Sequence, residues 1–156
     1  MKAPECIRGF FYWKPSQILR IGFNAERDNQ RKLYLNTFDT LTLHPRVAAG
    51  IKAAGYTTPT PIQAEAIPTV MEGRDVMGLA QTGTGKTAAF VLPILQRLLS
   101  GPRGCLRALI ISPTRELAEQ THNYINVLAA RTKLRSAVVY GGVGKPAQIA
   151  KIKGGA

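Results

Sequence analysis

The stretch Ala80-Gln81-Thr82-Gly83-Thr84-Gly85-Lys86-Thr87 lies between two short apolar runs. This order is typical of a strand, a glycine-containing loop and a helix, whose inward backbone N–H groups and positive N-terminus form a cradle for phosphate oxygens. Lys86 would reach the outer phosphates, and the Thr87 hydroxyl would bind Mg²⁺. The general form of this pattern begins with glycine, where this chain has Ala80. We interpret residues 80–87 as a nucleotide-binding loop, and a chance resemblance to the pattern is the alternative.

The composition is that of one globular domain with a strong excess of positive charge. The chain has 156 residues, 45% of them hydrophobic, which is enough to bury a single core. Its 21 Lys and Arg against 9 Asp and Glu give a net charge of +12. Such an excess favours a polyanionic partner, most commonly nucleic acid. The alternative is a solvated basic surface that keeps the protein soluble.

The cysteines and apolar runs indicate neither a secreted nor a membrane protein. Cys6 and Cys105 are far apart, and neither has a metal-binding partner nearby in the sequence, so no disulfide framework or zinc site is expected. No apolar run approaches the roughly 20 residues that cross a bilayer. We expect a soluble, cytoplasmic protein.

The first 35 residues show no sustained period of a helix or a strand. Four aromatic side chains at residues 10–13 are followed by Lys14, with further basic residues nearby, which suits the stacking of single-stranded RNA. The interpretation we prefer is that residues 1–35 form an extension outside the fold.

The remainder, from residue 36, alternates between helical and strand patterns. Proline near a helix start and glycine after its end mark several of the boundaries. Helices are predicted at residues 45–54, 60–71, 86–99, 114–128 and 146–153, and strands at 75–79, 106–112 and 136–140. We therefore predict an α/β fold, a parallel sheet with helices on both faces and its ligand at the carboxyl ends of the strands.

Three further stretches lie where that geometry would place a ligand. The amide of Gln63, in the first turn of a helix, matches the donor and acceptor of adenine, although a plain surface glutamine is the alternative. Thr114 and Arg115, after the second predicted strand, could hold a backbone phosphate, or could be an ordinary helix cap and charged first turn. Gly141-Gly142 could let a nucleic-acid strand approach closely, or could be a simple turn.

Together, these segments resemble the first RecA-like domain of the DEAD-box ATP-dependent RNA helicases. Gly55 to Gln63 is similar to the Q motif of that family, with Phe38 as its isolated upstream aromatic. Residues 80–87 match the family's phosphate loop, including its alanine, while residues 113–118 match motif Ia and Gly141-Gly142 the GG motif. The resemblance covers residues 36–156, and within the family it is greatest to bacterial members of the RhlE type.

The resemblance implies a role for each of these residues. Those implied to bind ATP are Phe38, Tyr56, Thr60, Gln63, Ala80, Gln81, Thr82, Gly83, Thr84, Gly85, Lys86 and Thr87. Lys86 and Thr87 would position the phosphates and Mg²⁺. Those implied to contact the RNA sugar-phosphate backbone, independently of base sequence, are Pro113, Thr114, Arg115, Gly141 and Gly142.

Segments on which the family's chemistry depends do not occur in these 156 residues. The sequence contains neither Asp-Glu-Ala-Asp nor Ser-Ala-Thr, and no second RecA-like domain. The family's domain would thus be present only in part, a truncated RecA-like fold. Because phosphoryl transfer depends on those charges, we expect this chain alone to bind ATP and RNA without hydrolysing ATP.

Two other functions fit parts of the sequence. One is a short, non-catalytic module that binds a nucleotide or RNA, which the charge and the intact phosphate loop permit. The other is a P-loop kinase or GTPase, against which Gln63 and residues 113–118 argue.

Overall fold

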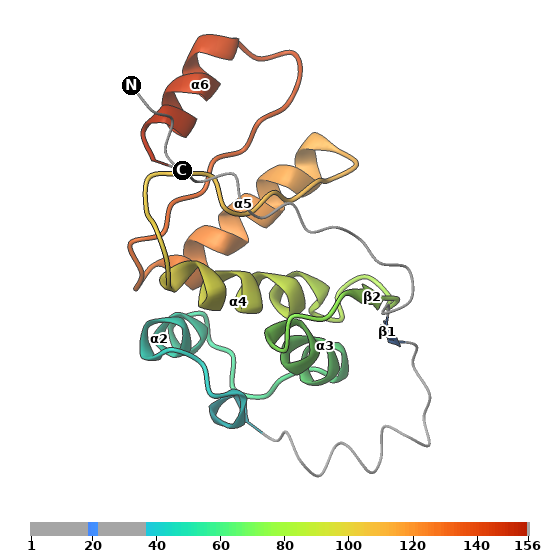
Figure 1. Cartoon of the computed structure of the whole chain (residues 1–156). Coiled ribbons are helices and arrows are strands. Elements are labelled where there is room, and N and C mark those ends of the chain that lie inside the picture. Colours follow the sequence, from blue (N-terminus) through green and yellow to red (C-terminus); the bar gives the residue numbers. More distant parts are fainter. Residues whose placement is uncertain (1–18, 22–36, 156) are drawn as a thin grey trace.

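The computed structural model describes residues 19–21 and 37–155 (Figure 1). The elements within these ranges are β1 (Leu19–Ile21), a 3₁₀ helix (Phe38–Leu41), α2 (Pro45–Ala53), α3 (Pro61–Met71), β2 (Val76–Gly78), α4 (Lys86–Leu99), α5 (Arg115–Ala129) and α6 (Lys145–Lys153). The five predicted helices are confirmed to within one or two residues at their ends. The hypothesis of an RNA-stacking segment at residues 10–14 lies outside the described residues.

Local signals set the helix boundaries. Helix α2 begins with Pro45 in its first turn, and the backbone N–H of Arg46 donates to the Nδ1 atom of the preceding His44. Gly55 follows the helix at φ 79°, a backbone angle that favours glycine and ends the helix. Helix α3 likewise has Thr60 as its N-cap and proline at its first position.

Helix α4 is the centre of the hydrophobic core. Val91, Leu92 and Leu95 on one side of α4 are 0–2% exposed. They pack against the buried side chains of α2 and α3 and against Leu128 near the end of α5. Figure 1 accordingly shows α4 in the middle of these helices, and α2 and α5 also contact each other directly. The core thus holds the helix that follows the phosphate loop.

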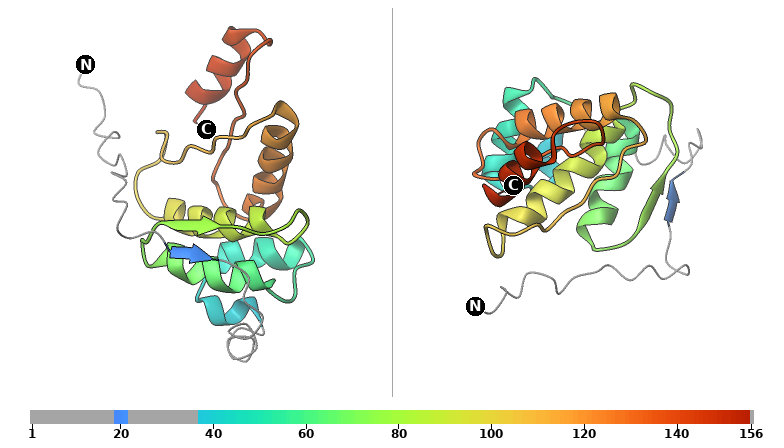
Figure 2. Two further views of the ribbon diagram at one scale, coloured as in Figure 1. Left: turned by 90° about the vertical axis from the view of Figure 1, so that its right-hand side faces the viewer. Right: turned by 90° about the horizontal axis from the view of Figure 1, so that it is seen from above.

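The sheet of the described structure is a parallel pair of short strands. β1 pairs with β2 in the register Leu19 with Val76 and Ile21 with Gly78, and the two arrows lie side by side in both views of Figure 2. Helix α3 packs beside β2. The placement of the whole of residues 1–35 outside the fold is therefore wrong for residues 19–21, which supply the strand next to the phosphate loop.

Two of the three predicted strands are not formed as strands. Residues 106–112 and 136–140 carry no strand hydrogen bonding, and Leu109 and Ile111 are 85% and 86% exposed, where a buried strand was predicted. An extended segment becomes a strand only beside another at about 4.8 Å. These two segments line a shared groove and do not pair with each other as strands. Among the described residues, the predicted parallel sheet is thus realised as the pair β1 and β2, with α3 packed beside it.

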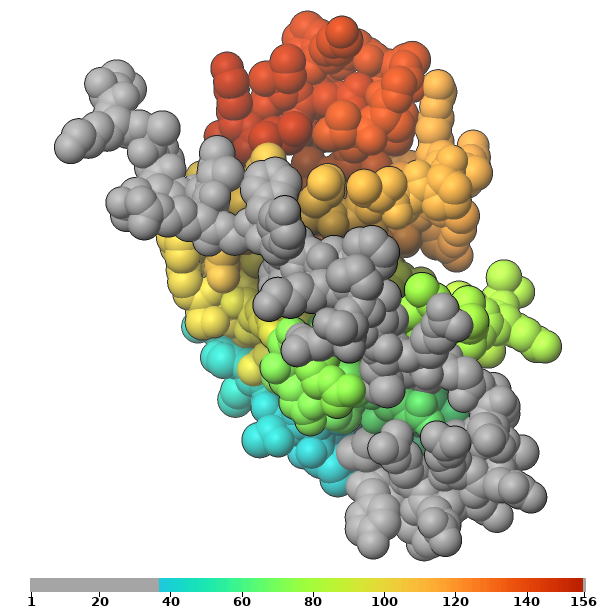
Figure 3. Space-filling view, turned by 45° about the vertical axis from the view of Figure 1, so that its right-hand side comes forward, coloured from blue at the N-terminus to red at the C-terminus, as the bar shows by residue number. Residues whose placement is uncertain are grey.

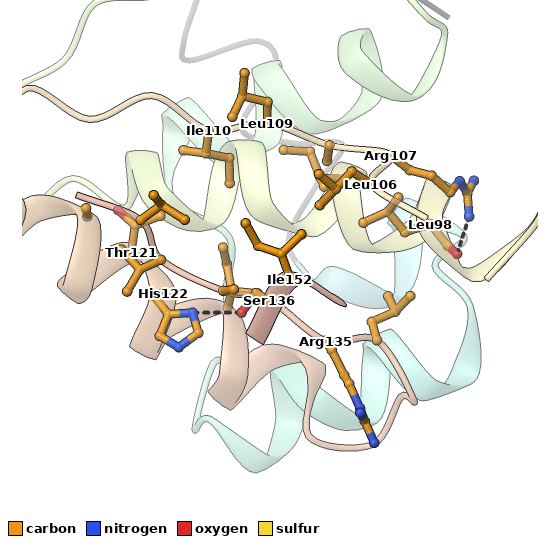
Figure 4. Close-up of a pocket in the computed structure, with 18 of the residues that line it drawn as sticks. Leu98, Leu106, Arg107, Leu109, Ile110, Thr121, His122, Arg135, Ser136 and Ile152 are labelled. Carbon is orange, nitrogen blue, oxygen red and sulfur yellow. Dashed lines mark hydrogen bonds between the residues drawn. The ribbon is translucent and has the colours of Figure 1, made fainter. Parts of the chain in front are cut away.

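The groove between these segments measures about 620 Å³ and is largely apolar. Figure 4 shows Leu98 of α4, Leu106 and Ile152 of α6 among its lining residues. At one end, Arg107 donates hydrogen bonds to the carbonyl oxygens of Leu98 (2.9 Å) and Ser100 (2.6 Å), which satisfies the end of α4. Arg107 thus ties this segment to the end of α4 by side-chain hydrogen bonds, where strand pairing was predicted.

Within residues 37–155 and β1, no helix has both the length and the apolar character that crossing a bilayer requires.

Candidate functional site

The phosphate-loop sequence forms a tight loop between β2 and α4. Gly83 and Gly85 have φ angles of 80° and 87°, which side chains with a Cβ rarely adopt. The Thr84 hydroxyl donates to the Gln81 carbonyl at 2.8 Å and closes the loop on itself. The predicted strand, glycine loop and helix are therefore all present.

Lys86 is directed back over the loop from the first position of α4. Its ammonium group donates to the Ala80 carbonyl oxygen at 2.5 Å and also to the carbonyl oxygen of Gln81. The positive charge therefore lies at the mouth of the loop, where an anion bound to the loop would meet it. A phosphate oxygen can replace these carbonyls, because the same three N–H donors serve either acceptor.

Gln63 connects the start of α3 to the phosphate loop. Its side chain is 1% exposed, its Nε2 donates to the Gly85 carbonyl at 3.1 Å, and its Oε1 accepts from the Thr60 N–H at 3.0 Å. A Cβ at Gly85 would lie only 2.3 Å from that Nε2. A plain surface glutamine, the alternative considered for Gln63, is therefore wrong, and the amide still has one N–H and one lone pair for a ligand.

The hydroxyl of Thr60 is buried; its oxygen faces the Gln63 N–H in the capping box that begins α3, and its proton has no acceptor among the described residues. It lies next to the loop, since a Cβ on Gly85 would be 3.0 Å away from it. Buried polar groups are normally satisfied, so a hydroxyl donor without an acceptor beside a glycine-rich loop fits a site that takes a polar ligand. The residues present thus fit a phosphate-bearing molecule.

The predicted adenine-packing residues lie in a separate aromatic cluster. Phe38 is 8% exposed and meets Tyr56 edge-on at 6.3 Å between ring centroids. Tyr56 in turn contacts Tyr124 of α5 at 6.1 Å, and burial raises its pKa above the ordinary value. These rings pack into the core around α4, and their role toward adenine stays a prediction.

The predicted RNA-contacting residues are all exposed, at the start of α5 and in the turn before α6. Thr114 is the N-cap of α5, and its hydroxyl oxygen accepts a hydrogen bond from the Leu117 N–H at 3.3 Å. The alternative that Thr114 is a helix cap is therefore confirmed. The pKa of Glu116, in the same turn, is lowered by a hydrogen bond from its own backbone and another from the Thr114 hydroxyl. A backbone phosphate could still meet the N–H groups at this helix end.

Arg115 and Gly142, 27 positions apart in the printed sequence, lie together in the structure. A Cβ on Gly142 would be 2.8 Å from the Nη2 of Arg115, and the residue has a φ of 81°. The Arg115 guanidinium lies 5.7 Å from the ring centre of Tyr140. The structure therefore joins the two stretches that were predicted separately, and Figure 3 shows this last third of the chain (orange to red) gathered at one end of the molecule.

Three residues at this interface were missed from the sequence. The Tyr140 hydroxyl donates to a Glu119 oxygen at 2.7 Å, and Gln148 of α6 hydrogen-bonds the backbone of Tyr140 on both sides. No local pattern marks these residues, since Tyr140 ends an apparent strand and the other two occupy ordinary helix positions. Their only signal is proximity in space.

We predict that Glu119 controls the ionisation of Tyr140. The hydrogen bond to Glu119 and then its negative charge raise the pKa of Tyr140 above the ordinary tyrosine value, against a smaller lowering by Arg115. The contact is therefore fully present below the ordinary tyrosine pKa and is lost as pH rises through the raised folded value. In an absorbance titration of phenolate, Glu119→Gln should move this pKa down.

A Tyr140→Phe variant identifies which transition belongs to Tyr140, and Glu116→Gln on the same helix is the matched control. An unmoved Tyr140 transition in Glu119→Gln would contradict the assignment.

Comparison with known proteins gives a consistent result. A family model described as "DEAD/DEAH box helicase" matches residues 60–156. The ATP-dependent rRNA helicase RRP3 from Meyerozyma guilliermondii is 43% identical over 130 residues, which cover 83% of this chain and 27% of the relative. The ATP-dependent RNA helicase RhlB from Xanthomonas oryzae pv. oryzae is 49% identical over 113 residues, 69% of this chain and 20% of the relative.

Solved structures are similar as well. The RNA helicase Prp28 from Chaetomium thermophilum, bound to ADP, has a TM-score of 0.71 at 33% identity and covers 78% of this chain. A DEAD box protein from Methanococcus jannaschii has a TM-score of 0.71 at 35% identity and covers 77% of this chain. The matched region is 30% and 32% of those two chains, so this chain spans less than a third of each protein named.

Proposed function

Because the chain belongs to the DEAD/DEAH box helicase family, we propose that it is the ATP-binding and RNA-binding portion of an ATP-dependent RNA helicase. Family membership removes the P-loop kinase or GTPase as an alternative. The truncated RecA-like fold agrees with that of the solved helicases. We assign residues 36–156 to the N-terminal part of the ATP-binding domain.

One observation carries the nucleotide half of the proposal, namely the hydrogen bond of Gln63 to the Gly85 carbonyl. It puts an amide suited to adenine beside the loop suited to phosphates, so a single nucleotide can span both. The unused donor of the Thr60 hydroxyl in the same place supports this. In this proposal Gln63 selects adenine, residues 80–87 hold the phosphates, and Phe38 and Tyr56 act from the neighbouring aromatic cluster.

Mg²⁺ would be held by the nucleotide phosphates and by the hydroxyl of Thr87. The described residues contain no group of three or more His, Cys, Asp or Glu side chains placed to bind a metal. Mg²⁺ keeps several waters and is commonly bound through substrate phosphates and one or two carboxylates, so the Thr87 hydroxyl would supply only part of the protein's contribution. When bound, the ion would neutralise phosphate charge.

The RNA half rests on charge and exposure. From residue 120 to residue 156 the sequence has six Lys and Arg and no Asp or Glu. The exposed Pro113, Thr114 and Arg115 precede this basic part, and the turn at Gly141-Gly142 lies within it. Contacts of this kind with the sugar-phosphate backbone would be independent of base sequence and strongly weakened by salt.

Calorimetry with the 156-residue chain tests the proposal. We expect saturable binding of Mg²⁺-ATP in preference to Mg²⁺-GTP, with affinity at least about tenfold weaker in Lys86→Ala, because a charge-assisted contact to phosphate is lost. We expect no RNA-stimulated phosphate release above that of Lys86→Ala. Equal affinity for ATP and GTP would contradict the role of Gln63, and turnover would contradict the non-catalytic part.

A stand-alone binding module without catalysis is the second candidate, favoured by the intact phosphate loop. This candidate predicts the same ATP binding. It differs from the first in that binding, and not hydrolysis within a larger helicase, would be the function of the protein. The cytoplasmic location and the second RecA-like domain are likewise proposals, as is the similarity to RhlE-type members.

A further inference from the structure

The turn formed by residues 140–143 is held at both ends by a single side chain. The Gln148 amide accepts from the Tyr140 N–H at 3.0 Å and donates to the Tyr140 carbonyl at 3.1 Å and to the Val143 carbonyl at 3.2 Å. One side chain therefore satisfies the backbone as a neighbouring strand would, and it does so on either side of Gly141-Gly142.

Holding this turn has an energetic consequence for binding. Ordering the backbone of a residue costs conformational entropy, and glycine loses more freedom than any other residue. A turn already held by Gln148 would not have to be ordered again when a nucleic-acid strand binds. Without the three hydrogen bonds, Gly141 and Gly142 would pay that cost on binding.

The same turn positions the guanidinium of Arg115. Gln148 fixes Tyr140, whose ring lies under the guanidinium at 5.7 Å and whose hydroxyl is held by Glu119. Stacking on a ring face leaves the N–H edges of a guanidinium free to bind an acceptor. Gly142 lies close to the Nη2 atom of Arg115 and so bounds the guanidinium away from the ring. The arginine is thus bracketed between a ring and a bare backbone.

We propose that Gln148 is a positioning residue for RNA binding: its amide fixes the turn at residues 140–143, and through Tyr140 it holds Arg115 toward a backbone phosphate. The proposal rests on the RNA-binding role proposed above. Gln148 itself need not touch RNA.

The test uses Gln148→Met in the 156-residue chain with a fluorescein-labelled oligouridine as the RNA probe. This change removes the hydrogen bonds at nearly constant volume and removes no charge. Helix α6 contains no buried residue, so the change leaves the core intact. We expect RNA affinity about fivefold weaker, the size expected when a charge-assisted contact is partly lost, with ATP affinity unchanged. Gln120→Met, on the exposed surface of α5, is the matched control.

The salt dependence provides a readout that a merely structural role would not move. Loss of one phosphate contact lowers the slope of log affinity against log salt by about 0.7 for a single strand. Arg115→Ala should show that decrease directly, and Gln148→Met should show part of it although it removes no charge. In the Arg115→Ala background, Gln148→Met should add little further loss.

A second variant covers the possibility that methionine disturbs the turn in another way. Gln148→Glu keeps an acceptor for the Tyr140 N–H but sets an oxygen against the Tyr140 and Val143 carbonyls. We expect the same loss of RNA affinity, measured against Gln120→Glu to account for the added negative charge.

The outcomes separate the two proposals. If the unmodified chain binds RNA and Gln148→Met matches it in affinity and salt slope, the positioning role is overturned and the RNA-binding role stands. If Gln148→Met weakens ATP and RNA binding equally and also lowers the melting temperature, the effect is a general one and the positioning role is overturned. If the unmodified chain shows no salt-dependent RNA binding, both proposals fall.

Discussion

Replacing Gly50 with alanine is expected to lower the free energy of unfolding by about 2 kcal/mol, although alanine is the better helix former. Gly50 lies in α2 at its crossing with α5, where a Cβ would be 2.0 Å from the Leu128 carbonyl oxygen and 3.0 Å from the Leu128 carbonyl carbon. Both atoms are backbone, so no side chain can turn aside. The gain of about 1 kcal/mol in helix propensity is outweighed because the two helices must separate.

Denaturant unfolding with a fluorescence or circular-dichroism signal measures this change. Gly144→Ala is the matched control, because a Cβ there would meet nothing within 4 Å and its φ of −53° is open to any residue. We expect the control to remain within about 0.5 kcal/mol of the unmodified chain. A Gly50→Ala variant as stable as that control, or more stable, would show that α2 and α5 do not approach each other this closely.

Replacing Gly85 with alanine is expected to weaken ATP binding by at least about tenfold, through two effects that act together. Gly85 has a φ of 87°, which costs alanine about 1–2 kcal/mol. Its Cβ would also lie 2.3 Å from the Nε2 of Gln63 and 3.2 Å from the Cδ of that side chain. The amide would have to leave its place against the Gly85 carbonyl, so the loop would lose its connection to the start of α3.

Gly83→Ala separates these two effects, and ATP titration by calorimetry measures both variants. Gly83 has a similar φ of 80°, but a Cβ there would meet nothing within 4 Å. We expect a clearly smaller loss of ATP affinity in Gly83→Ala. Equal losses in the two variants would mean that backbone strain alone matters and that the Gln63 contact contributes nothing to nucleotide binding.

The importance of Gly85 can be predicted from the sequence, whereas that of Gly50 cannot. Gly85 belongs to a motif, so a special role for it could be predicted from its neighbours alone. Gly50 lies in a helix with no motif around it, and in sequence it is only a poor helix former. Its importance comes from Leu128, 78 positions away, and was found only once the helices were placed.

The candidate site divides in the same way. Lys86, Thr87 and the loop glycines could be predicted because they follow one another in the chain and because strand, loop and helix are each marked locally. The burial of Gln63 against Gly85 was not predicted, since the sequence was also compatible with an exposed glutamine. Tyr140 and Gln148 were missed because the contact of Tyr140 with Arg115 and the hydrogen bonds of Gln148 to Tyr140 form only in the folded chain.

By itself, the sequence determined the five helices, their capping residues, the phosphate loop and the family to which the chain belongs. These depend on residues within a few positions of one another, where proline, glycine and threonine set backbone angles and caps directly. Only the tertiary structure decided which extended segments became strands, because a strand needs a partner that no local pattern supplies. It paired residues 19–21 with β2 and left residues 106–112 and 136–140 along an open groove, and it brought Arg115 next to Gly142, 27 positions further along the chain.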